Sequence, residues 1–457
     1  YTFAEQSLTG WAPTGLVCTT GGTANPNNVE ASILITSGAN VTCTFTNAKP
    51  GAQIDLTPLT ATNKVGDNHV ITATVLVHNG DGVYASSTDG TLVEFSFTTN
   101  TPVPPAIFVG GVDTCTTTDG SCSITINSTA TGNVAVHASS TPVVITVPVH
   151  VETDGLGQNS ADAQKDYVNA RISIAQSDTN AVDDPHTFTV TVEQNTGTTS
   201  GFTGVSGIFP TVVFTPGAPG TVTDNCNLTG TNGSGQCTVV INSAVAGVFT
   251  ATASANILVN TVPFSLTTNG LNGNSQPAVK TYVDANISLD PLNETNQVNE
   301  PHTVTVTVTK DPGTGPVPAA GEHVDFTLTD GGGAVSVLNA AASTCDEAGP
   351  NTDVNGQCVI VFNSASPGTV TIHAEVDVTI DSVTMHRESG DGLSGDSADA
   401  NKKYEGGRII VEKITVGGND QFTFDTDYKV DFQLGNGGSD DSGFIPTGAH
   451  SVSEINI

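Results

Sequence analysis

Eight cysteines offer the clearest chemistry in this sequence, because they fall in four consecutive close pairs. An even number of closely paired cysteines is typical of disulfides formed in an oxidising compartment. Zinc ligands usually lie about two to four residues apart, and these pairs are wider, so zinc is the weaker interpretation. We therefore predict an extracellular or cell-surface protein with four local disulfides, which join Cys18 to Cys43, Cys115 to Cys122, Cys226 to Cys237 and Cys345 to Cys358.

Ten histidines raise the question of catalysis or of a transition-metal site. Three of them, His69, His186 and His302, hold equivalent repeat positions, one in each unit, so they cannot cluster within a domain. We expect them to be structural and to bond to turn carbonyls. The motifs of serine hydrolases, zinc proteases, P-loop proteins and dinucleotide-binding enzymes do not occur in a suitable strand–helix context. The sequence therefore predicts a protein that is not an enzyme.

Acidic side chains between the repeats are candidate calcium ligands, since hard oxygen donors from loops suit Ca²⁺. The equivalent segment between the second and third repeats carries Asn269, Asn274 and Pro277 instead. This loss of charge favours solvated turns, and weakly bound calcium is the alternative. No other cofactor is expected. The candidate ligands are Asp154, Asp162, Asp391, Asp396 and Asp399.

The charge balance narrows the range of partners. The chain has 45 acidic residues against 12 basic ones, which gives a formal net charge of −33. Such a chain repels phosphate backbones and anionic lipid, so nucleic-acid binding and a basic membrane-surface role are disfavoured. No apolar run reaches the roughly 18 residues of a membrane-spanning helix, so no membrane insertion is predicted.

Internal repeats define the elements that must position these residues. A Gly-x-Cys frame recurs at Gly120, Gly235 and Gly356, and each copy is followed by Asn-Ser and then by a glycine that opens an alternating strand. The landmarks recur about every 115 to 122 residues. Period-2 alternation between turn residues is typical of antiparallel sandwiches with about seven strands. We predict an all-β protein of tandem antiparallel Ig-like β-sandwiches.

A second motif lies between the units and combines Gly-Leu, an Asn-Ser or Asp-Ser pair, and Lys-x-Tyr. It occurs at residues 154–167, 269–282 and 391–404. Each serine is placed to cap a single helical turn, with Asp or Pro two residues later. This predicts short ordered joints and a semi-rigid array.

The third repeat carries a family resemblance. Its segments 324–328, 353–357 and 366–372 resemble bacterial Ig-like domains of the invasin/intimin type. The resemblance covers roughly residues 50 to 403 in three copies. It implies an extracellular stalk or fibre, and it carries no catalytic residues to transfer.

The two ends fall outside the repeat. Glu5 and Glu454 lie in similar alternating segments, and the flanking strands resemble prealbumin-like β-domains of Gram-positive pilins and surface proteins. Residues 1–49 are similar to the closing half of such a domain and residues 404–457 to its opening half. Either the chain is an excerpt of a longer tandem polypeptide, or one copy completes the next by strand complementation. The expected domains are 1–49, 50–165, 166–281, 282–403 and 404–457.

The prealbumin-like resemblance also implies a cross-link. In that family a lysine and an asparagine can form an isopeptide bond beside a glutamate, and the matching residues here are Lys413, Asn47, and Glu454 or Glu5. The chemistry requires a buried, neutral lysine and a buried carboxyl group that transfers protons. Because Lys413 and Asn47 lie at opposite ends of the chain, the bond would join subunits or successive blocks. The alternative is a surface lysine and a strand-end asparagine without a cross-link.

We predict a non-enzymatic extracellular structural protein that is a subunit or repeat block of a head-to-tail filament or surface stalk, with copies of itself as partners. One alternative is an adhesin that binds a host or cell-surface ligand, and a remoter one is a spacer of a secreted multidomain enzyme. Aromatic residues make up only 5% of the chain, which gives little support to a sugar-stacking surface. Candidate glycosylation sequons occur at Asn40, Asn127, Asn227, Asn232, Asn286 and Asn293.

Overall fold

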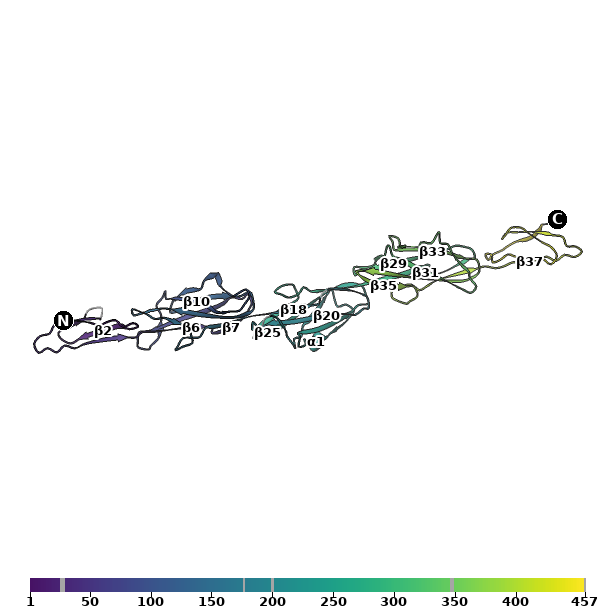
Figure 1. Cartoon of the computed structure of the whole chain (residues 1–457). Coiled ribbons are helices and arrows are strands. Elements are labelled where there is room, and N and C mark those ends of the chain that lie inside the picture. The colour runs from purple at the N-terminus through teal and green to yellow at the C-terminus, as the bar shows by residue number, and fades with distance from the viewer. Residues whose placement is uncertain (25–28, 176, 199–200, 346–348, 456–457) are drawn as a thin grey trace.

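The regular secondary structure of the described residues is almost entirely β-strand, in mainly antiparallel sheets, so the predicted all-β class is confirmed. The computed structural model describes residues 1–24, 29–175, 177–198, 201–345 and 349–455. In this part of the chain the helical elements are the 3-10 turn η1 (Val109–Gly111) and the short helix α1 (Asn225–Thr229). Neither is long and apolar enough to cross a membrane. Figure 1 shows an elongated row of sandwiches with the two termini at opposite ends.

Ig-like domain 1 is a two-sheet sandwich. Its strands are β6 (Gly51–Thr57), β7 (Thr60–Lys64), β8 (His69–His78), β9 (Ala85–Ser86), β10 (Leu92–Asn100), β11 (Ile107–Phe108), β12 (Thr114–Thr116), β13 (Ser121–Asn127), β14 (Gly132–Ser140), β15 (Val143–Val144), β16 (Val147–Pro148), β17 (Val151–Glu152) and β18 (Ala163–Ile174). One sheet has the order β11-β13-β8-β6, and the other has the order β12-β10-β14-β18. The first segment after β6, strand β7, runs parallel to β18.

Ig-like domain 2 repeats this plan. Its further strands are β19 (Asp178–Ala181), β20 (His186–Asn195), β21 (Thr203–Gly204), β22 (Thr211–Thr215), β23 (Thr221–Asp224), β24 (Gln236–Asn242), β25 (Gly247–Val259), β26 (Val262–Thr267) and β27 (Ala278–Asp290). One sheet has the order β18-β20-β24-β23, and the other has the order β22-β25-β27. Strand β19 pairs parallel to β27.

Ig-like domain 3 completes the series. Its further strands are β28 (Asn293–Gln297), β29 (His302–Asp311), β30 (Val317–Pro318), β31 (Val324–Gly331), β32 (Ser336–Leu338), β33 (Gln357–Ser364), β34 (Gly368–Ile380), β35 (Val383–Glu388) and β36 (Ala400–Glu405). One sheet has the order β27-β29-β33-β32, and the other has the order β28-β36-β34-β31. Strand β28 runs parallel to β36.

Two long strands belong to two domains each. The first part of β18 pairs with β14 of domain 1, and its second part pairs with β20 of domain 2. In the same way β27 pairs with β25 and then with β29. The expected boundaries after residues 165 and 281 therefore fall inside continuous strands, and the boundary expected after residue 403 cuts strand β36 of domain 3. Extended backbone that is hydrogen-bonded on both sides of a boundary makes a stiff joint.

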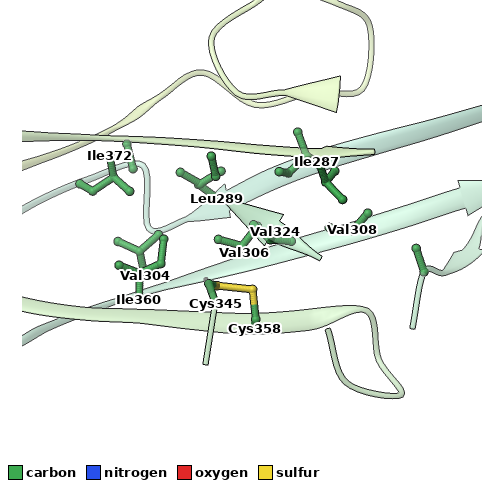
Figure 2. Packing of buried hydrophobic residues seen from close by; sticks show 14 of the residues in the cluster. Ile287, Leu289, Val304, Val306, Val308, Val324, Cys345, Cys358, Ile360 and Ile372 are labelled. Carbon is green, nitrogen blue, oxygen red and sulfur yellow. A yellow bond between two sulfur atoms is a disulfide. The ribbon is translucent and has the colours of Figure 1, made fainter. Parts of the chain in front are cut away.

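Each sandwich encloses one cluster of buried apolar side chains. Strand β29 supplies Val304, Val306 and Val308, which are fully buried, while the threonines between them are more exposed. Figure 2 shows these valines packed between the two sheets, close to the Cys345–Cys358 disulfide. Alternating β-branched residues suit a pleated strand with one buried face. The core thus follows from the period-2 pattern of the sequence.

The Gly-x-Cys frame has a backbone reason. Gly356 has φ 75°, a left-handed conformation that glycine adopts without strain. A Cβ added there would lie 2.3 Å from the carbonyl oxygen of Val308, so the tight turn admits no side chain. The cysteine two residues later then lies in the next strand, within reach of its partner. The four disulfides 18–43, 115–122, 226–237 and 345–358 are present.

The predicted helical turn at each joint is wrong. Asn159 Oδ1 accepts from the Ile54 amide at 3.1 Å, and Ser160 Oγ accepts from the Leu56 amide at 2.9 Å. These amides lie on β6, the edge of its sheet, and short polar side chains satisfy them in place of a neighbouring strand. The same bonds link Asn274 and Ser275 to Ile172 and Ile174, and Asp396 and Ser397 to Ile287 and Leu289.

The end segments form small sheets. The N-terminal strands are β1 (Thr2–Ala4), β2 (Ala12–Cys18), β3 (Gly22–Ala24), β4 (Glu30–Ile33) and β5 (Cys43–Ala48), paired in the order β1-β4-β3 and as the ribbon β2-β5. The C-terminal strands are β37 (Ile410–Glu412), β38 (Phe422–Thr426), β39 (Phe432–Leu434), β40 (Ser439–Asp441) and β41 (Val452–Ile455), paired as β37-β40 and β39-β38-β41. Their prealbumin-like character stays a prediction.

Replacing Ser275 by alanine should destabilise Ig-like domain 2 by about 1–2 kcal/mol, because the buried Ile174 amide loses its acceptor. Calorimetry of the whole chain should show one transition moving to lower temperature. The control is Ser265→Ala on β26, where the serine side chain is exposed. Equal shifts in the two variants would contradict the edge-capping role of the joint.

Candidate functional site

The C-terminal segment holds a lysine–glutamate pair. Lys413 follows β37, Glu454 lies in β41, and their Nζ and Oε2 atoms are 2.7 Å apart. The Lys413 ammonium also lies over the Phe422 ring, 3.7 Å from its centroid. The lysine side chain is only 15% exposed. Two of the three residues predicted for the cross-link therefore meet at this end.

The N-terminal segment holds the complementary pair. Asn47 in β5 donates from Nδ2 to Glu5 Oε1 at 2.6 Å. The other carboxylate oxygen of Glu5 is buried and has no hydrogen-bond partner among the described residues. Both side chains line a pocket of about 280 Å³ together with Leu8, Trp11 and Pro13. This end thus offers an amide and a carboxylate beside an apolar hollow.

The chain does not bring these two pairs together. Lys413 and Asn47 lie in segments at opposite ends of the elongated molecule (Figure 1). A bond between them needs two copies or two successive blocks, as the sequence predicts. The intermolecular cross-link stays a prediction.

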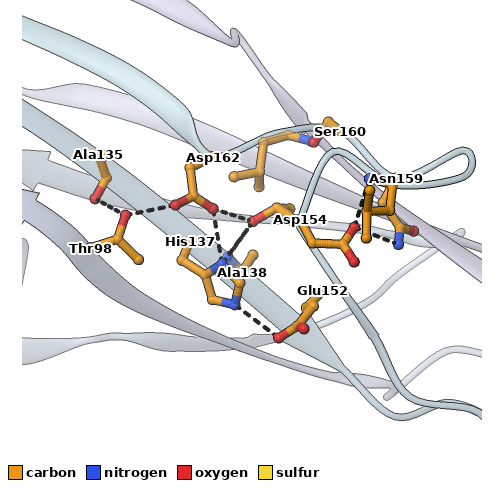
Figure 3. A network of polar contacts seen from close by, with 12 residues as sticks. Thr98, Ala135, His137, Ala138, Glu152, Asp154, Asn159, Ser160 and Asp162 are labelled. Carbon is orange, nitrogen blue, oxygen red and sulfur yellow. Dashed lines mark hydrogen bonds and ion pairs between the residues drawn. The ribbon is translucent and has the colours of Figure 1, made fainter.

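The calcium candidates of domain 1 have other partners. Asp162 accepts hydrogen bonds from Thr98 at 2.6 Å and Thr153 at 2.8 Å, and it lies 2.9 Å from His137 Nδ1 (Figure 3). Burial raises the pKa of Asp162, but these hydrogen bonds outweigh it and hold the pKa below its usual value. Asp154 instead caps its own turn by accepting from the Leu156 amide.

The candidates of domain 3 are arranged similarly. Asp399 bonds to Ser389 at 2.6 Å and His373 at 3.0 Å. Asp391 accepts from its own turn, and Asp396 accepts from the Ile287 amide. Burial raises the pKa of Asp396 to about 6. Because most of these carboxylates already bind protein donors, the geometry offers little support for calcium, which stays a prediction.

Another acidic group was missed by the sequence analysis. Within the described residues, His373, Glu375 and Glu388 place ligand atoms within 4.8 Å of one another. The two glutamates face each other across β34 and β35. The signal is visible only after strand pairing, because the carboxylates come from different strands.

The sequons differ in exposure. Asn127 and Asn286 are half-buried, and their side-chain amides already donate to Gly66 and Ser394 carbonyls. Glycosylation stays a prediction at all six sites. The exposed members are Asn40, Asn227, Asn232 and Asn293.

A buried lysine in every Ig-like domain is the main feature that sequence analysis did not interpret. Each lies on the last strand of its domain and is at most 1% exposed. Each contacts the side-chain oxygen of an asparagine on the parallel edge strand, and its ammonium lies over a buried tyrosine ring. We call each group a lysine cluster: Lys165, Asn63, Tyr167 and His69; Lys280, Asn180, Tyr282 and His186; Lys402, Asn296, Tyr404 and His302.

The sequence contains a signal that could have drawn attention to these lysines. The Lys-x-Tyr motif recurs at the end of each joint, and the chain has only 12 basic residues. Three of so few cations at one repeat position point to a common role. The sequence could not show that the role is burial, because the asparagine partner lies about one domain away along the chain.

Two of the lysine clusters contain a carboxylate. Lys280 Nζ is 3.7 Å from Asp178 Oδ2, and His186 Nδ1 is 3.4 Å from the same oxygen. In domain 3 the corresponding distances to Glu294 Oε2 are 3.5 Å from Lys402 and 3.2 Å from His302. These two histidines therefore face a carboxylate and a lysine, and no hydrogen bond from their side chains to a turn carbonyl is found among the described residues.

Burial controls the protonation of these groups. Desolvation lowers the pKa of Lys165 to about 8, and it also lowers the pKa of Lys280 and Lys402. Burial and then the charge of Lys402 lower the pKa of His302 to about 4. The clusters thus favour neutral amines and neutral imidazoles relative to water.

Comparisons with known proteins find similarity in structure alone. No protein-family model and no curated protein sequence matches the chain. The D0-D1 domain of intimin matches with 16% identity and a TM-score of 0.17, covering 50% of this chain and 98% of that chain. The Yersinia pseudotuberculosis adhesin InvE matches with 16% identity and a TM-score of 0.18, covering 52% and 58%.

A third match is the D1-D4 ectodomain fragment of ICAM-5, with 10% identity and a TM-score of 0.32, covering 89% of this chain and 99% of that chain. With TM-scores below 0.5, none of these matches bears on what the protein binds or does.

Ig-like domain 3 should lose stability as the pH falls from about 6.5 to about 4. In that window the unfolded chain protonates His302 and the folded domain does not, so proton binding favours unfolding by about 1–3 kcal/mol. The variant His302→Gln should flatten this pH dependence in scanning calorimetry.

The control is His386→Gln. A hydrogen bond with Asp377 raises the pKa of exposed His386, so protonation of this histidine stabilises the folded domain at acid pH. Replacing His386 should therefore make the domain lose stability more steeply as the pH falls. An unchanged pH dependence in His302→Gln would refute the assignment.

Proposed function

We propose that this protein is a non-enzymatic extracellular structural protein, a subunit or repeat block of a head-to-tail filament or surface stalk. The observation that carries the proposal is the complementarity of the two ends. One end offers a partly buried lysine beside Glu454, and the other offers Asn47 beside Glu5. Each end holds what the other lacks for an amide bond.

The shape of the array supports a load-bearing role. The sandwiches lie in a row, and the strands β18 and β27 run from one domain into the next (Figure 1). One disulfide joins two neighbouring segments of the chain within each unit. An elongated, stiff and locally cross-linked chain fits the needs of a stalk better than those of a compact receptor.

The end segments carry apolar side chains in need of cover. Trp11 and Phe3 are 41% and 55% exposed at one end, and Val416 and Val430 are 100% and 87% exposed at the other. The buried residues of the three described core clusters lie within residues 54–404, outside residues 1–49 and 406–457. Small open sheets bury little apolar surface alone, and their edges favour pairing with another segment.

Mixing two shortened proteins tests this assembly. A protein without residues 406–457 keeps the Asn47 end and all of strand β36, and a protein without residues 1–49 keeps the Lys413 end. We expect each alone to remain monomeric and the mixture to form a one-to-one complex, measured by sedimentation. Failure of the mixture to associate at concentrations far above micromolar would refute end-to-end complementation.

The covalent step is tested separately. Lys413→Arg should leave association intact and abolish complexes that survive boiling in detergent, because a guanidinium does not attack the amide. The matched control is Lys429→Arg, which alters another lysine of the same segment that pairs with Asp440. Dissociation of the unaltered complex in detergent would show that the ends join without a bond.

A further inference from the structure

We propose that Ig-like domains 2 and 3 each form an internal isopeptide bond, between Lys280 and Asn180 and between Lys402 and Asn296, with Asp178 and Glu294 as the proton-transfer groups. Domain 1 holds the lysine and the asparagine without the carboxyl group, so it remains unlinked. These bonds lie within single domains and are independent of the assembly of the ends.

Strand register brings the reacting groups together. In domain 3 the parallel strands β28 and β36 place Glu294 opposite Lys402 and Asn296 opposite Tyr404. Glu294 and Asn296 are two residues apart, so their side chains leave the strand on one face. Lys402 Nζ lies 2.5 Å from Asn296 Oδ1 and 3.5 Å from Glu294 Oε2. Nucleophile, amide and carboxylate thus meet at one point.

Domain 2 has the same arrangement. Asp178 lies opposite Lys280 in the register of β19 and β27, and Asn180 lies opposite Tyr282. The ammonium contacts Asn180 Oδ1 and lies 3.7 Å from Asp178 Oδ2. Domain 2 has Asp178 where domain 3 has Glu294. The carboxyl group is common to both sites, which indicates that it is the functional group required there.

The step is an amide exchange without a redox change. The neutral lysine Nζ attacks Cγ of the asparagine, an Nζ–Cγ bond forms, and the Cγ–Nδ2 bond breaks. One proton passes from Nζ to Nδ2 through the carboxyl group, and ammonia leaves. The products are one secondary amide and one ammonia, so no co-reactant is needed.

The surroundings favour this reaction. Lys280 and Lys402 are completely buried, and each lies beside a buried tyrosine ring, 5.3 Å and 5.9 Å from the ring centroid. Desolvation lowers the pKa of both lysines, which raises the fraction of the nucleophilic amine. The side chains of Asp178 and Glu294 are 56% and 53% exposed, so only the lysine side of the site is dry. Fixed neighbours reduce the cost of bringing the groups together.

Domain 1 provides a natural comparison. Lys165 is buried against Asn63 and Tyr167, as in the other domains, but Ala61 lies opposite the lysine where the others have Asp or Glu. Acidic residues beyond the edge strand also act on all three lysines, namely Asp67, Asp184 and Glu300. The carboxyl group opposite the lysine is therefore the feature by which domain 1 differs.

The bond would connect the last strand of a domain to the edge strand that follows its first strand. The asparagine lies on the edge strand at the start of the domain, and the lysine lies on its last strand. The bonded residues are 100 and 106 positions apart, whereas the disulfides of these domains span 11 and 13. The bond therefore closes nearly the whole domain, and the disulfide fastens one loop.

Intact-mass spectrometry of the full chain, denatured and reduced, tests the proposal. Each bond removes one ammonia, about 17 Da, so the unaltered chain should be about 34 Da lighter than its sequence mass. Proteolysis should yield two branched peptides, one with Lys280 and Asn180 and one with Lys402 and Asn296. A mass equal to the sequence mass would overturn the proposal without any variant.

Variants assign the roles. Asp178→Ala and Glu294→Ala should each restore about 17 Da, and Ala61→Asp should remove a further 17 Da by linking Lys165 to Asn63. Alanine variants that keep the full deficit would overturn the role of the carboxyl group. The same holds for a branched peptide that joins Lys165 to Asn63 in the unaltered chain, or for Ala61→Asp that folds and stays unlinked.

Discussion

The burial of one lysine in each sandwich is the constraint on which the arrangement of the Ig-like domains depends. Removing an ammonium from water costs on the order of several kcal/mol unless partners replace the lost hydration. The asparagine and the tyrosine ring supply those partners, and domains 2 and 3 add a carboxylate. Because the lysine is on the last strand and the asparagine is on the first edge strand, this polar contact specifies their parallel pairing. The neighbouring tyrosine, Tyr167, Tyr282 or Tyr404, is among the largest fully buried side chains.

Neighbouring domains are joined by strands that they share. Strands β18 and β27 end one sandwich and begin the next, so no flexible linker separates the domains. Where such a strand becomes the edge of a sheet, the Asn-Ser or Asp-Ser pair of the following joint accepts its free amides. One repeated dipeptide thereby blocks edge pairing with foreign strands and ties the joint to the domain it follows.

The two end segments differ from the Ig-like domains in how much apolar surface they bury. Each sandwich buries an apolar core and one lysine, whereas the terminal segments expose aromatic and aliphatic side chains in the same segments as Lys413 and Asn47. The same three kinds of group, an amine, an amide and a carboxylate, occur complete within domains 2 and 3 and divided between the two ends. The two proposed reactions would close the domains and join the copies with one chemistry, which would suit a stalk under tension.

Local patterns were enough to predict the all-β class, the three repeats and the cysteine pairing. The alternation of apolar and polar residues in a strand has a period of two residues. The paired cysteines of domains 2 and 3 lie 11 and 13 positions apart. Both signals can therefore be read within a short stretch of chain. Local patterns also misled, since Ser160 caps the edge of β6 and not a helix. The lysine clusters were decided by tertiary structure. Lys165 meets Asn63 across 102 positions only because β7 lies parallel to β18 at the sheet edge. A residue's own neighbours determine which face of a strand it occupies, but the packing of two sheets decides which strand lies beside it.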